Sequence, residues 1–190
     1  MHCANIETQT TGIILAGGKS TRMGSNKALL YYKNKRLIDH AMSLLEQTGI
    51  KDIIVSGKIS GYHCVPDITP HQGPLGGINS TMLQIGNKSK QLLFIPVDMP
   101  LLTSNTTRHL LQNLHDFDAV FYEHCPLPLV INFTSSIQIK LTKQLKERPE
   151  GGSIKDFLSN LHVTTLRHPD HIILELLNIN TQKDYSQLPD

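Results

Sequence analysis

The sequence predicts a three-layer α/β/α domain built on a mostly parallel, twisted sheet. Short continuous apolar runs such as 12–16 and 92–97 have the composition of buried parallel strands. These runs alternate with segments of helical periodicity, and glycines often separate the two kinds of segment. The chain shows no internal repeat or shift in composition. We therefore expect one α/β domain over 1–190, in which 1–11 is flexible.

The individual elements follow from the same patterns. Leu37, Ala41 and Leu45 share one face of a helix that Gly49 is placed to end. A turn at 73–77 opens a helix that runs to about residue 85. The expected strands are 12–16, 29–32, 53–55, 64–66, 92–97, 119–122, 129–131 and 172–177. The further helices are one that Ser104 caps, 135–146, 153–161 and a short one at 184–188.

Charge and cysteine content exclude several classes of protein. Lys and Arg number 18 against 16 Asp and Glu, a net charge of +2 that does not indicate nucleic acid or a membrane surface as partner. No apolar run approaches the roughly 20 residues of a membrane span, and the N-terminal residues lack the apolar core of a secretory signal. Cys3, Cys64 and Cys125 form no metal-ligand pair, so we expect reduced thiols in a cytoplasmic protein.

The loop after the first strand has the composition of a polyphosphate site. Gly17 and Gly18 allow backbone N–H groups to approach phosphate oxygens closely, and Lys19, Arg22 and Lys27 supply cations. Arg22 can bind two oxygens at once, whereas Lys27 acts as a mobile point charge. The spacing fits neither the Walker A motif nor GxGxxG. A solvated basic loop is the alternative interpretation.

Other candidates also follow strand ends, where ligands bind in open parallel sheets. Asp98 follows the apolar run 92–97 and is placed to hold Mg²⁺, or else to cap a turn before Pro100. Asp67 is placed to contact a base or ribose, or else to close a turn. The glycines of 73–77 can offer backbone N–H groups at a helix start, or simply allow tight packing.

Four segments together resemble the signatures of the MobA-type molybdenum cofactor guanylyltransferases, within the sugar-nucleotide transferase superfamily. Residues 15–24 read LAGGKSTRMG, close to the family pattern LAGGxSxRMG that a Lys follows, here Lys27. Asp67 with GPLGG at 73–77 is similar to the D…GPLxG segment, and VDMP at 97–100 is similar to a strand end of the family. NINT at 178–181 is similar to the closing VNTPED element. Asn26 and Gln182 depart from the pattern, where Asp and Pro are usual.

The resemblance implies a Rossmann-like fold of the nucleotide-diphospho-sugar transferase type. It also implies transfer of GMP from GTP to the terminal phosphate of molybdopterin, with release of pyrophosphate and with Mg²⁺ held by Asp98. Lys27, Arg22 and Asp98 would be the catalytic residues. Molybdoenzymes or their chaperones would be the partners that receive the product. The implied nucleotide-binding residues are Leu15, Ala16, Gly17, Gly18, Lys27, Ser56, Asp67, Gly76, Asp98 and Asn180.

Two alternatives remain open at the level of sequence. One is a related enzyme that uses CTP on the same pterin, or that uses another phosphate acceptor. Such relatives more often read LAAG, so Gly17 favours GTP. The other is a nucleotide-binding accessory protein without catalysis, which the departures at Asn26 and Gln182 keep in consideration.

Overall fold

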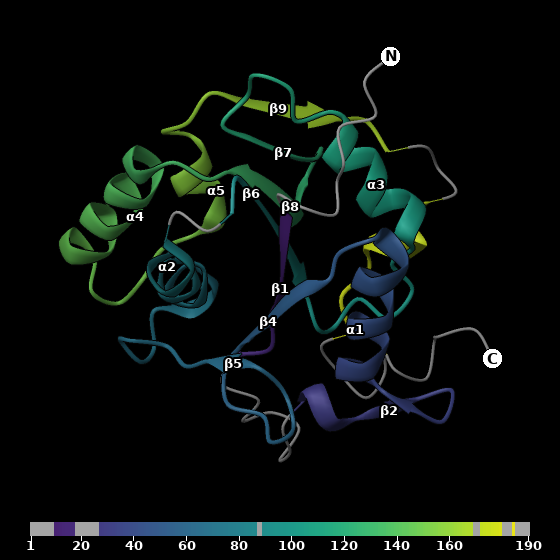
Figure 1. Cartoon of the computed structure of the whole chain (residues 1–190). Coiled ribbons are helices and arrows are strands. Elements are labelled where there is room, and N and C mark those ends of the chain that lie inside the picture. The colour runs from purple at the N-terminus through teal and green to yellow at the C-terminus, as the bar shows by residue number, and fades with distance from the viewer. Residues whose placement is uncertain (1–9, 18–26, 87–88, 169–171, 180–183, 185–190) are drawn as a thin grey trace.

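The computed structural model describes residues 10–17, 27–86, 89–168, 172–179 and 184. A seven-stranded sheet has the order β5-β4-β1-β6-β8-β7-β9, and β2 and β3 form a separate hairpin (Figure 1). The strands are β1 (Thr10–Leu15), β2 (Tyr31–Tyr32), β3 (Lys35–Arg36), β4 (Asp52–Ser56), β5 (Cys64–Val65), β6 (Gln91–Pro96), β7 (Ala119–Tyr122), β8 (Cys125–Asn132) and β9 (Val163–Leu166). The helices are α1 (Leu37–Thr48), α2 (Gly73–Ile85), α3 (Ser104–Gln112), α4 (Ser135–Glu147) and α5 (Ile154–Leu158), with short 3-10 turns η3 (Lys27–Leu29) and η6 (Leu174–Leu176).

The large sheet is mostly parallel, which confirms the predicted class. β1 pairs in parallel with β4 and β6, and β4 pairs in parallel with β5. β8 runs antiparallel to both β6 and β7, and β9 runs parallel to β7. Six of the seven strands therefore run in one direction, and β8 alone is reversed within this sheet.

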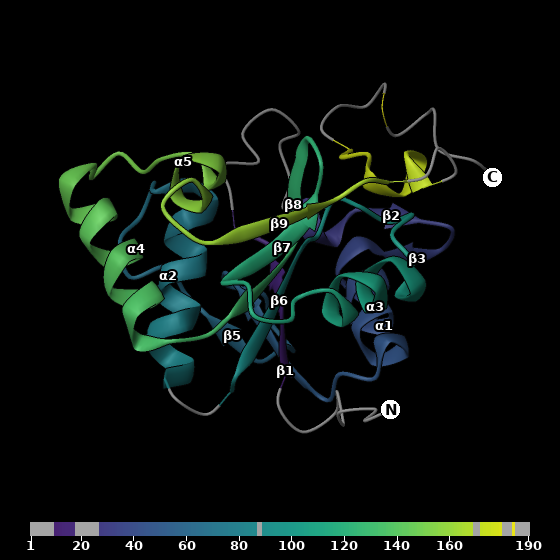
Figure 2. The same cartoon turned by 90° about the horizontal axis from the view of Figure 1, so that it is seen from above.

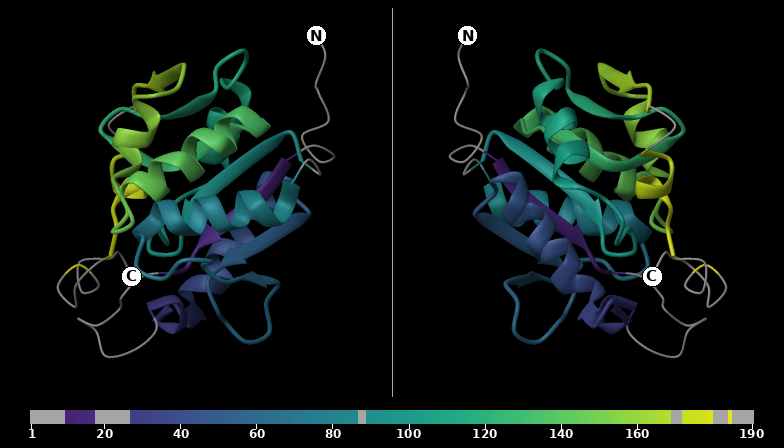
Figure 3. Two further views of the ribbon diagram at one scale, coloured as in Figure 1. Left: turned by 90° about the vertical axis from the view of Figure 1, so that its left-hand side faces the viewer. Right: turned by 90° about the vertical axis from the view of Figure 1, so that its right-hand side faces the viewer.

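Helices cover both faces of the sheet. α1 and α3 pack together on one face, whereas α2, α4 and α5 lie on the other (Figures 1 and 2). The green α4 and the teal α2 lie side by side over the sheet in the left view of Figure 3. The three layers of the prediction are present.

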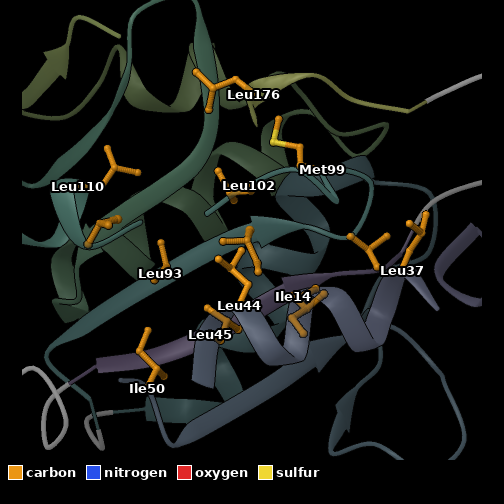
Figure 4. Close-up of a cluster of buried hydrophobic side chains, with 14 of the residues drawn as sticks. Ile14, Leu37, Leu44, Leu45, Ile50, Leu93, Met99, Leu102, Leu110 and Leu176 are labelled. Atoms are coloured by element: carbon orange, nitrogen blue, oxygen red, sulfur yellow. The ribbon is translucent and has the colours of Figure 1, made fainter. Parts of the chain in front are cut away.

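Two apolar cores result, one on each face. Successive residues of a strand point to opposite faces, so Ile13 enters one core and Ile14 the other. Figure 4 shows the core around Ile14, where Leu45 of α1 and Leu110 of α3 meet Leu93 of the sheet. Burial on both faces explains why the central strands are continuous apolar runs rather than alternating ones.

The first strand begins earlier than the sequence predicts. Thr10 and Thr11 belong to β1 and are buried, which corrects the expectation that 1–11 is flexible for these two residues. Their polar side chains have partners, since the Thr11 hydroxyl donates to Asp52 Oδ2 at 2.7 Å and that of Thr10 donates to Gln91 Oε1 at 3.2 Å. The remainder of that segment, 1–9, lies outside the described residues.

The ends of two helices test the capping predictions. Gly49 ends α1 with φ 99°, and its N–H donates to carbonyls in the last turn, as predicted. The cap of α3 is Thr103 rather than Ser104, because the Thr103 hydroxyl accepts from the backbone N–H of Thr106. Glu175 reinforces this helix start by accepting from the Thr103 N–H at 3.1 Å and from the Thr106 hydroxyl at 2.6 Å.

The C-terminal prediction is wrong in one respect. Residues 172–177 do not form a strand but contain the 3-10 turn η6, and the last strand of the sheet is β9. Leu176 is buried in the core of Figure 4, while Leu174 and Leu177 are exposed. The expected helix 184–188 lies outside the described residues except for Asp184.

The turn between α4 and α5 depends on a glycine. Gly151 has φ 98°, and a Cβ there would lie 2.5 Å from the carbonyl oxygen of Gln72. Its neighbour Gly152 has an ordinary backbone, and the nearest atom to a Cβ would be Gln144 Nε2 at 3.4 Å. We expect Gly151→Ala to lower the free energy of unfolding by roughly 2–4 kcal/mol, because strain and collision with backbone add together.

Gly152→Ala is the matched control and should change the free energy of unfolding by less than about 1 kcal/mol. Denaturant unfolding of both variants measures the difference. Equal effects of the two substitutions would contradict this account of the turn.

Candidate active site

The site is organised by four parallel strand ends that stand level with one another. Leu15 at the end of β1 pairs with Ser56 on one side and with Pro96 on the other. Ser56 in turn pairs with Val65 at the end of β5. The residues that follow these four strands therefore reach the same edge of the sheet, as parallel sheets require.

The turn after β1 begins the predicted phosphate loop. The Ala16 N–H donates to the Ser56 carbonyl at 3.1 Å, which continues the pairing of β1 and β4 past the strand. Gly17 is exposed at the edge of the sheet. Gly18 and Arg22, which the sequence predicts to bind phosphate, lie outside the described residues, as does Lys19.

Lys27 and Asp98 form an ion pair at this edge. Lys27 Nζ lies 2.7 Å from Asp98 Oδ2, and their side chains are 16% and 19% exposed. Lys27 begins η3, where the chain resumes after the loop, and Asp98 follows β6. The structure thus brings together two predicted catalytic residues that are 71 positions apart in the sequence. The absence of Asp at position 26 does not deprive Lys27 of a carboxylate partner.

The C-terminal segment is attached to the same strand end. The Ile179 N–H donates to the Asp98 carbonyl oxygen at 2.9 Å. Asn180, the next residue, was predicted to bind nucleotide or acceptor and lies outside the described residues. The chain that leads to Asn180 is therefore fixed at Asp98.

A cavity of about 650 Å³ opens at the same edge of the sheet, over the ends of β1, β4 and β5. Its lining includes Asp67, which the sequence predicts, and Lys58 and His71, which it does not. The complete lining is Gly17, Gly57, Lys58, Pro66, Asp67, Pro70, His71, Gly73 and Pro74. A cavity of this size, with few charged groups in an otherwise apolar wall, is typical of small-molecule sites.

Asp67 is the half-buried carboxyl group of this cavity. Its Oδ1 is inaccessible to solvent and has no hydrogen-bond partner among the described residues. Burial raises the pKa of the Asp67 carboxyl above its ordinary value. Gly17 lies close by, since a Cβ on Gly17 would be 3.7 Å from Asp67 Oδ2. A buried acceptor without a donor among the described residues, in a group whose pKa burial has raised, marks Asp67 as a candidate functional residue.

Two further predicted residues are buried and are not part of the cavity lining. Ser56 is 1% exposed, and a Cβ on Gly77 would lie 2.4 Å from its hydroxyl oxygen. Gly77 is therefore needed for the close approach of α2 to β4. Gly76 packs against Gln72 in the same way, with a Cβ distance of 2.8 Å. The segment 73–77 is the first part of α2 rather than a separate turn.

Leu15 and Ala16 shape the strand end without lining the cavity. Leu15 is buried in the apolar core that also contains Ile13, and Ala16 is half-buried. The sequence-based prediction of the site includes neither Lys58 nor His71, although Lys58 comes three positions after the predicted strand 53–55. That position was the available signal for Lys58, whereas a lone histidine in a loop carries none.

The side chains at this edge of the sheet decide whether a metal ion can bind there. Among the described residues, no group of three or more His, Cys, Asp and Glu side chains comes together. The half-buried Asp98 carboxylate is nevertheless suited to an ion that takes its other ligands from water and substrate phosphates. Cys64 and Cys125 are free thiols, as predicted for these two residues.

Fold and site together define an α/β domain whose cavity and ion pair lie at the carboxyl ends of its parallel strands, where such domains bind ligands. The model of the MobA-like NTP transferase domain matches residues 12–164. The chain belongs to this family. It is 32% identical over 180 residues to the molybdenum cofactor guanylyltransferase of Xanthomonas euvesicatoria pv. vesicatoria, covering 94% of this chain and 93% of that protein.

Solved structures agree on the fold. The molybdopterin-guanine dinucleotide biosynthesis protein A of Archaeoglobus fulgidus superposes with a TM-score of 0.74 at 18% identity, covering 93% of this chain and 95% of that one. A 4-diphosphocytidyl-2C-methyl-D-erythritol synthase from Anaerococcus prevotii gives 0.70 at 12% identity, covering 94% and 95%. In the part of the chain that the structure describes, no helix has the length and apolar character needed to cross a bilayer.

The buried carboxyl of Asp67 predicts a cost to stability in the absence of ligand. The pKa of Asp67 is higher in the folded state, so the folded protein holds this proton more tightly than the unfolded chain does. The free energy of unfolding therefore falls as pH rises from the ordinary pKa of a carboxyl through the raised pKa of Asp67. Asp67→Asn removes the buried charge. We expect it to raise the free energy of unfolding at pH 8 by up to about 1 kcal/mol.

The increase in the free energy of unfolding caused by Asp67→Asn should shrink towards zero as pH falls below about 4, the ordinary pKa of a carboxyl. Thermal or denaturant unfolding at the two pH values measures it. A less stable Asp67→Asn variant at pH 8 would show that the carboxylate has a stabilising partner.

Proposed function

We propose that this protein transfers GMP from GTP to the terminal phosphate of molybdopterin, with release of pyrophosphate. The observation that carries the proposal is the Lys27–Asp98 ion pair, at the same edge of the sheet as a cavity that Asp67 lines. The relative from Xanthomonas euvesicatoria is named a molybdenum cofactor guanylyltransferase, which supplies the identity of donor and acceptor. The reaction is cytoplasmic in this account, and molybdoenzymes or their chaperones receive the product.

The order of the strands divides the site into two parts. Asp67 follows β5 and Lys58 follows β4, on one side of Gly17. Asp98 follows β6, on the other side of Gly17. A nucleoside in the cavity over β4 and β5 would direct its triphosphate past Gly17 towards Lys27 and Asp98.

The chemistry is a direct in-line displacement at the α-phosphorus of GTP. The acceptor phosphate is ionised near neutral pH, so the step needs no strong general base. The O–P bond to the acceptor forms as the bond to pyrophosphate breaks, and the pyrophosphate carries the released electron pair. The requirement on the protein is electrostatic, because several anionic groups must be held together.

Lys27 meets this requirement. Its flexible stem allows the ammonium to exchange Asp98 Oδ2 for a phosphate oxygen once the nucleotide has bound. There it offsets the charge that grows on the leaving pyrophosphate. Arg22 and the Gly18 amide are assigned the same task by the sequence alone.

Asp98 would hold Mg²⁺. Asp98 is a half-buried carboxylate at a strand end, and it is already paired with a cation. Proteins often bind Mg²⁺ through only one or two carboxylates, so this side chain fits the ion. When bound, the ion supplies charge neutralisation to the phosphates. Asp98 also accepts from Ile179 through its backbone, which fixes the carboxylate-bearing turn in place.

Asp98→Ala should abolish metal-dependent turnover without unfolding the protein, because the side chain lies at the edge of the sheet rather than in a core. Pyrophosphate release measures turnover, and circular dichroism confirms the fold. Full activity in the variant would remove Asp98 from the site.

Lys27→Ala should lower kcat by at least about 100-fold, since a cation that stabilises the leaving group acts mainly in the transition state. Lys143→Ala is the matched control, because Lys143 is an exposed lysine on α4. A loss in Lys27→Ala no larger than that of the control would contradict the assignment.

The function itself is tested by a pyrophosphate-release assay with GTP, CTP, ATP and UTP, each with and without molybdopterin. The proposal requires release from GTP that depends on the pterin. Release from CTP would instead favour cytidylyl transfer, and release that depends on a sugar phosphate would identify another acceptor. Binding of GTP without any release would indicate an accessory protein.

A further inference from the structure

The segment that leads into α2 forms one wall of the cavity. Four of the five residues 70–74 are exposed and line the cavity. They are Pro70, His71, Gly73 and Pro74. Gln72, in the middle of this wall, is 7% exposed and is not part of the lining. Its side chain reaches the end of α4 instead.

The amide of Gln72 bonds to the end of α4, which lies beside α2 over the same face of the sheet (Figure 3). Gln72 Nε2 donates to the Leu145 carbonyl at 3.4 Å and to the Pro149 carbonyl at 3.3 Å. In a continuing helix the Leu145 carbonyl would accept from the N–H of residue 149, but a proline has no N–H. Gln72 therefore supplies a donor that the helix itself cannot supply.

Two glycines allow close packing against Gln72. A Cβ on Gly151, in the turn after α4, would lie 2.5 Å from the Gln72 carbonyl oxygen. A Cβ on Gly76, near the start of α2, would lie 2.8 Å from the Gln72 Cβ. The turn after α4 thus packs on the backbone of Gln72 and α2 packs on its side chain, so the middle of the wall has little room to move.

The backbone on either side of Gln72 is left-handed. His71 has φ 73° and Gly73 has φ 64°, and both residues belong to the cavity wall. Glycine adopts this region readily, whereas the conformation costs free energy for a residue with a side chain such as His71. Such a conformation persists where the surrounding structure holds it. The bonds and the packing of Gln72 provide that support next to His71.

The geometry points to Gln72 as a positioning residue for the nucleotide. Gln72 ties the wall 70–74 to the end of α4, and so keeps the wall in the shape that receives the nucleoside. Lys27 and Asp98 belong to η3 and to the end of β6, outside this wall. The tie should therefore affect how tightly GTP binds rather than how fast bound GTP reacts. This inference rests on the proposed function, since it takes GTP as the ligand of the cavity.

Gln72→Met tests the tie, because methionine keeps the length of the side chain and removes the amide. The wall then loses its bonds to α4, and we expect the dissociation constant for GTP to rise about 10-fold. KM for GTP should rise by a similar factor, whereas kcat at saturating GTP should fall by less than about threefold. Calorimetry measures the dissociation constant and pyrophosphate release measures KM and kcat, at a temperature where the variant is fully folded.

Thr142→Val is the matched control. The Thr142 hydroxyl of α4 donates to Asn79 Oδ1 of α2 at 2.8 Å, and neither residue lines the cavity. Both variants should lower Tm, because each removes a side-chain hydrogen bond between α4 and the region of α2. Only Gln72→Met should weaken binding, and Thr142→Val should leave the dissociation constant for GTP within about twofold of the wild-type value.

Gly151→Ala reaches the same tie from the side of α4, and it keeps the inference testable if Gln72→Met does not fold. The added Cβ would push against the Gln72 carbonyl, so the dissociation constant for GTP should again rise, by at least about fivefold. Gly152→Ala should leave this constant unchanged, because the nearest atom to its Cβ would be 3.4 Å away.

The dissociation constants separate a positioning role from a structural one. A value for GTP within about threefold of the wild-type value in whichever of Gln72→Met and Gly151→Ala folds, at a lowered Tm, overturns the positioning role. A wild-type protein that binds GTP but releases no pyrophosphate contradicts the proposed function instead. The comparison of dissociation constants then still decides the role of Gln72.

Discussion

The level ending of four parallel strands is the constraint on which the rest of the site depends. Leu15 pairs with both Ser56 and Pro96, so β1 aligns the strands on either side of it. A shift of one residue in this register would turn every following side chain to the other face. Gly17, Asp67 and Asp98 reach the same edge of the sheet because the three strands before them end in the same row.

The same edge contains polar groups whose burial does not favour the stability of the fold. Asp67 is a buried acceptor without a donor among the described residues, and Lys27 and Asp98 are held against each other with little exposure. Burial of such groups costs free energy unless partners satisfy them. The apolar cores on both faces of the sheet supply the compensating stability, and a nucleotide would supply the missing partners.

The sequence predicts the parallel half of the fold well because burial on two faces leaves a continuous apolar run. The sequence-based prediction fails for segments that are only partly buried. β9 reads Val-Thr-Thr-Leu at the edge of the sheet and gives no clear pattern, whereas 172–177 is apolar but packs only part of its side chains inside. Local composition cannot distinguish these cases, since β9 is defined by its pairing with β7.

The residues of the site also fall into those that the sequence predicts and those that it does not. Lys27, Asp67 and Asp98 were predictable because they stand in family-like motifs or after apolar runs. Lys58 and His71 were not, because neither stands in a motif and a lone histidine in a loop carries no periodic signal. Their place in the cavity comes from the topology, which brings the β4–β5 loop and the segment before α2 beside Gly17.

The most direct test is a crystal structure with a GTP analogue whose α–β bridge resists cleavage. The account predicts the base in the cavity that Asp67 lines, the phosphates passing Gly17, and the α-phosphorus beside Lys27 and Asp98. A base bound on the β8 side of Asp98, with the triphosphate in the cavity at Asp67, would contradict it.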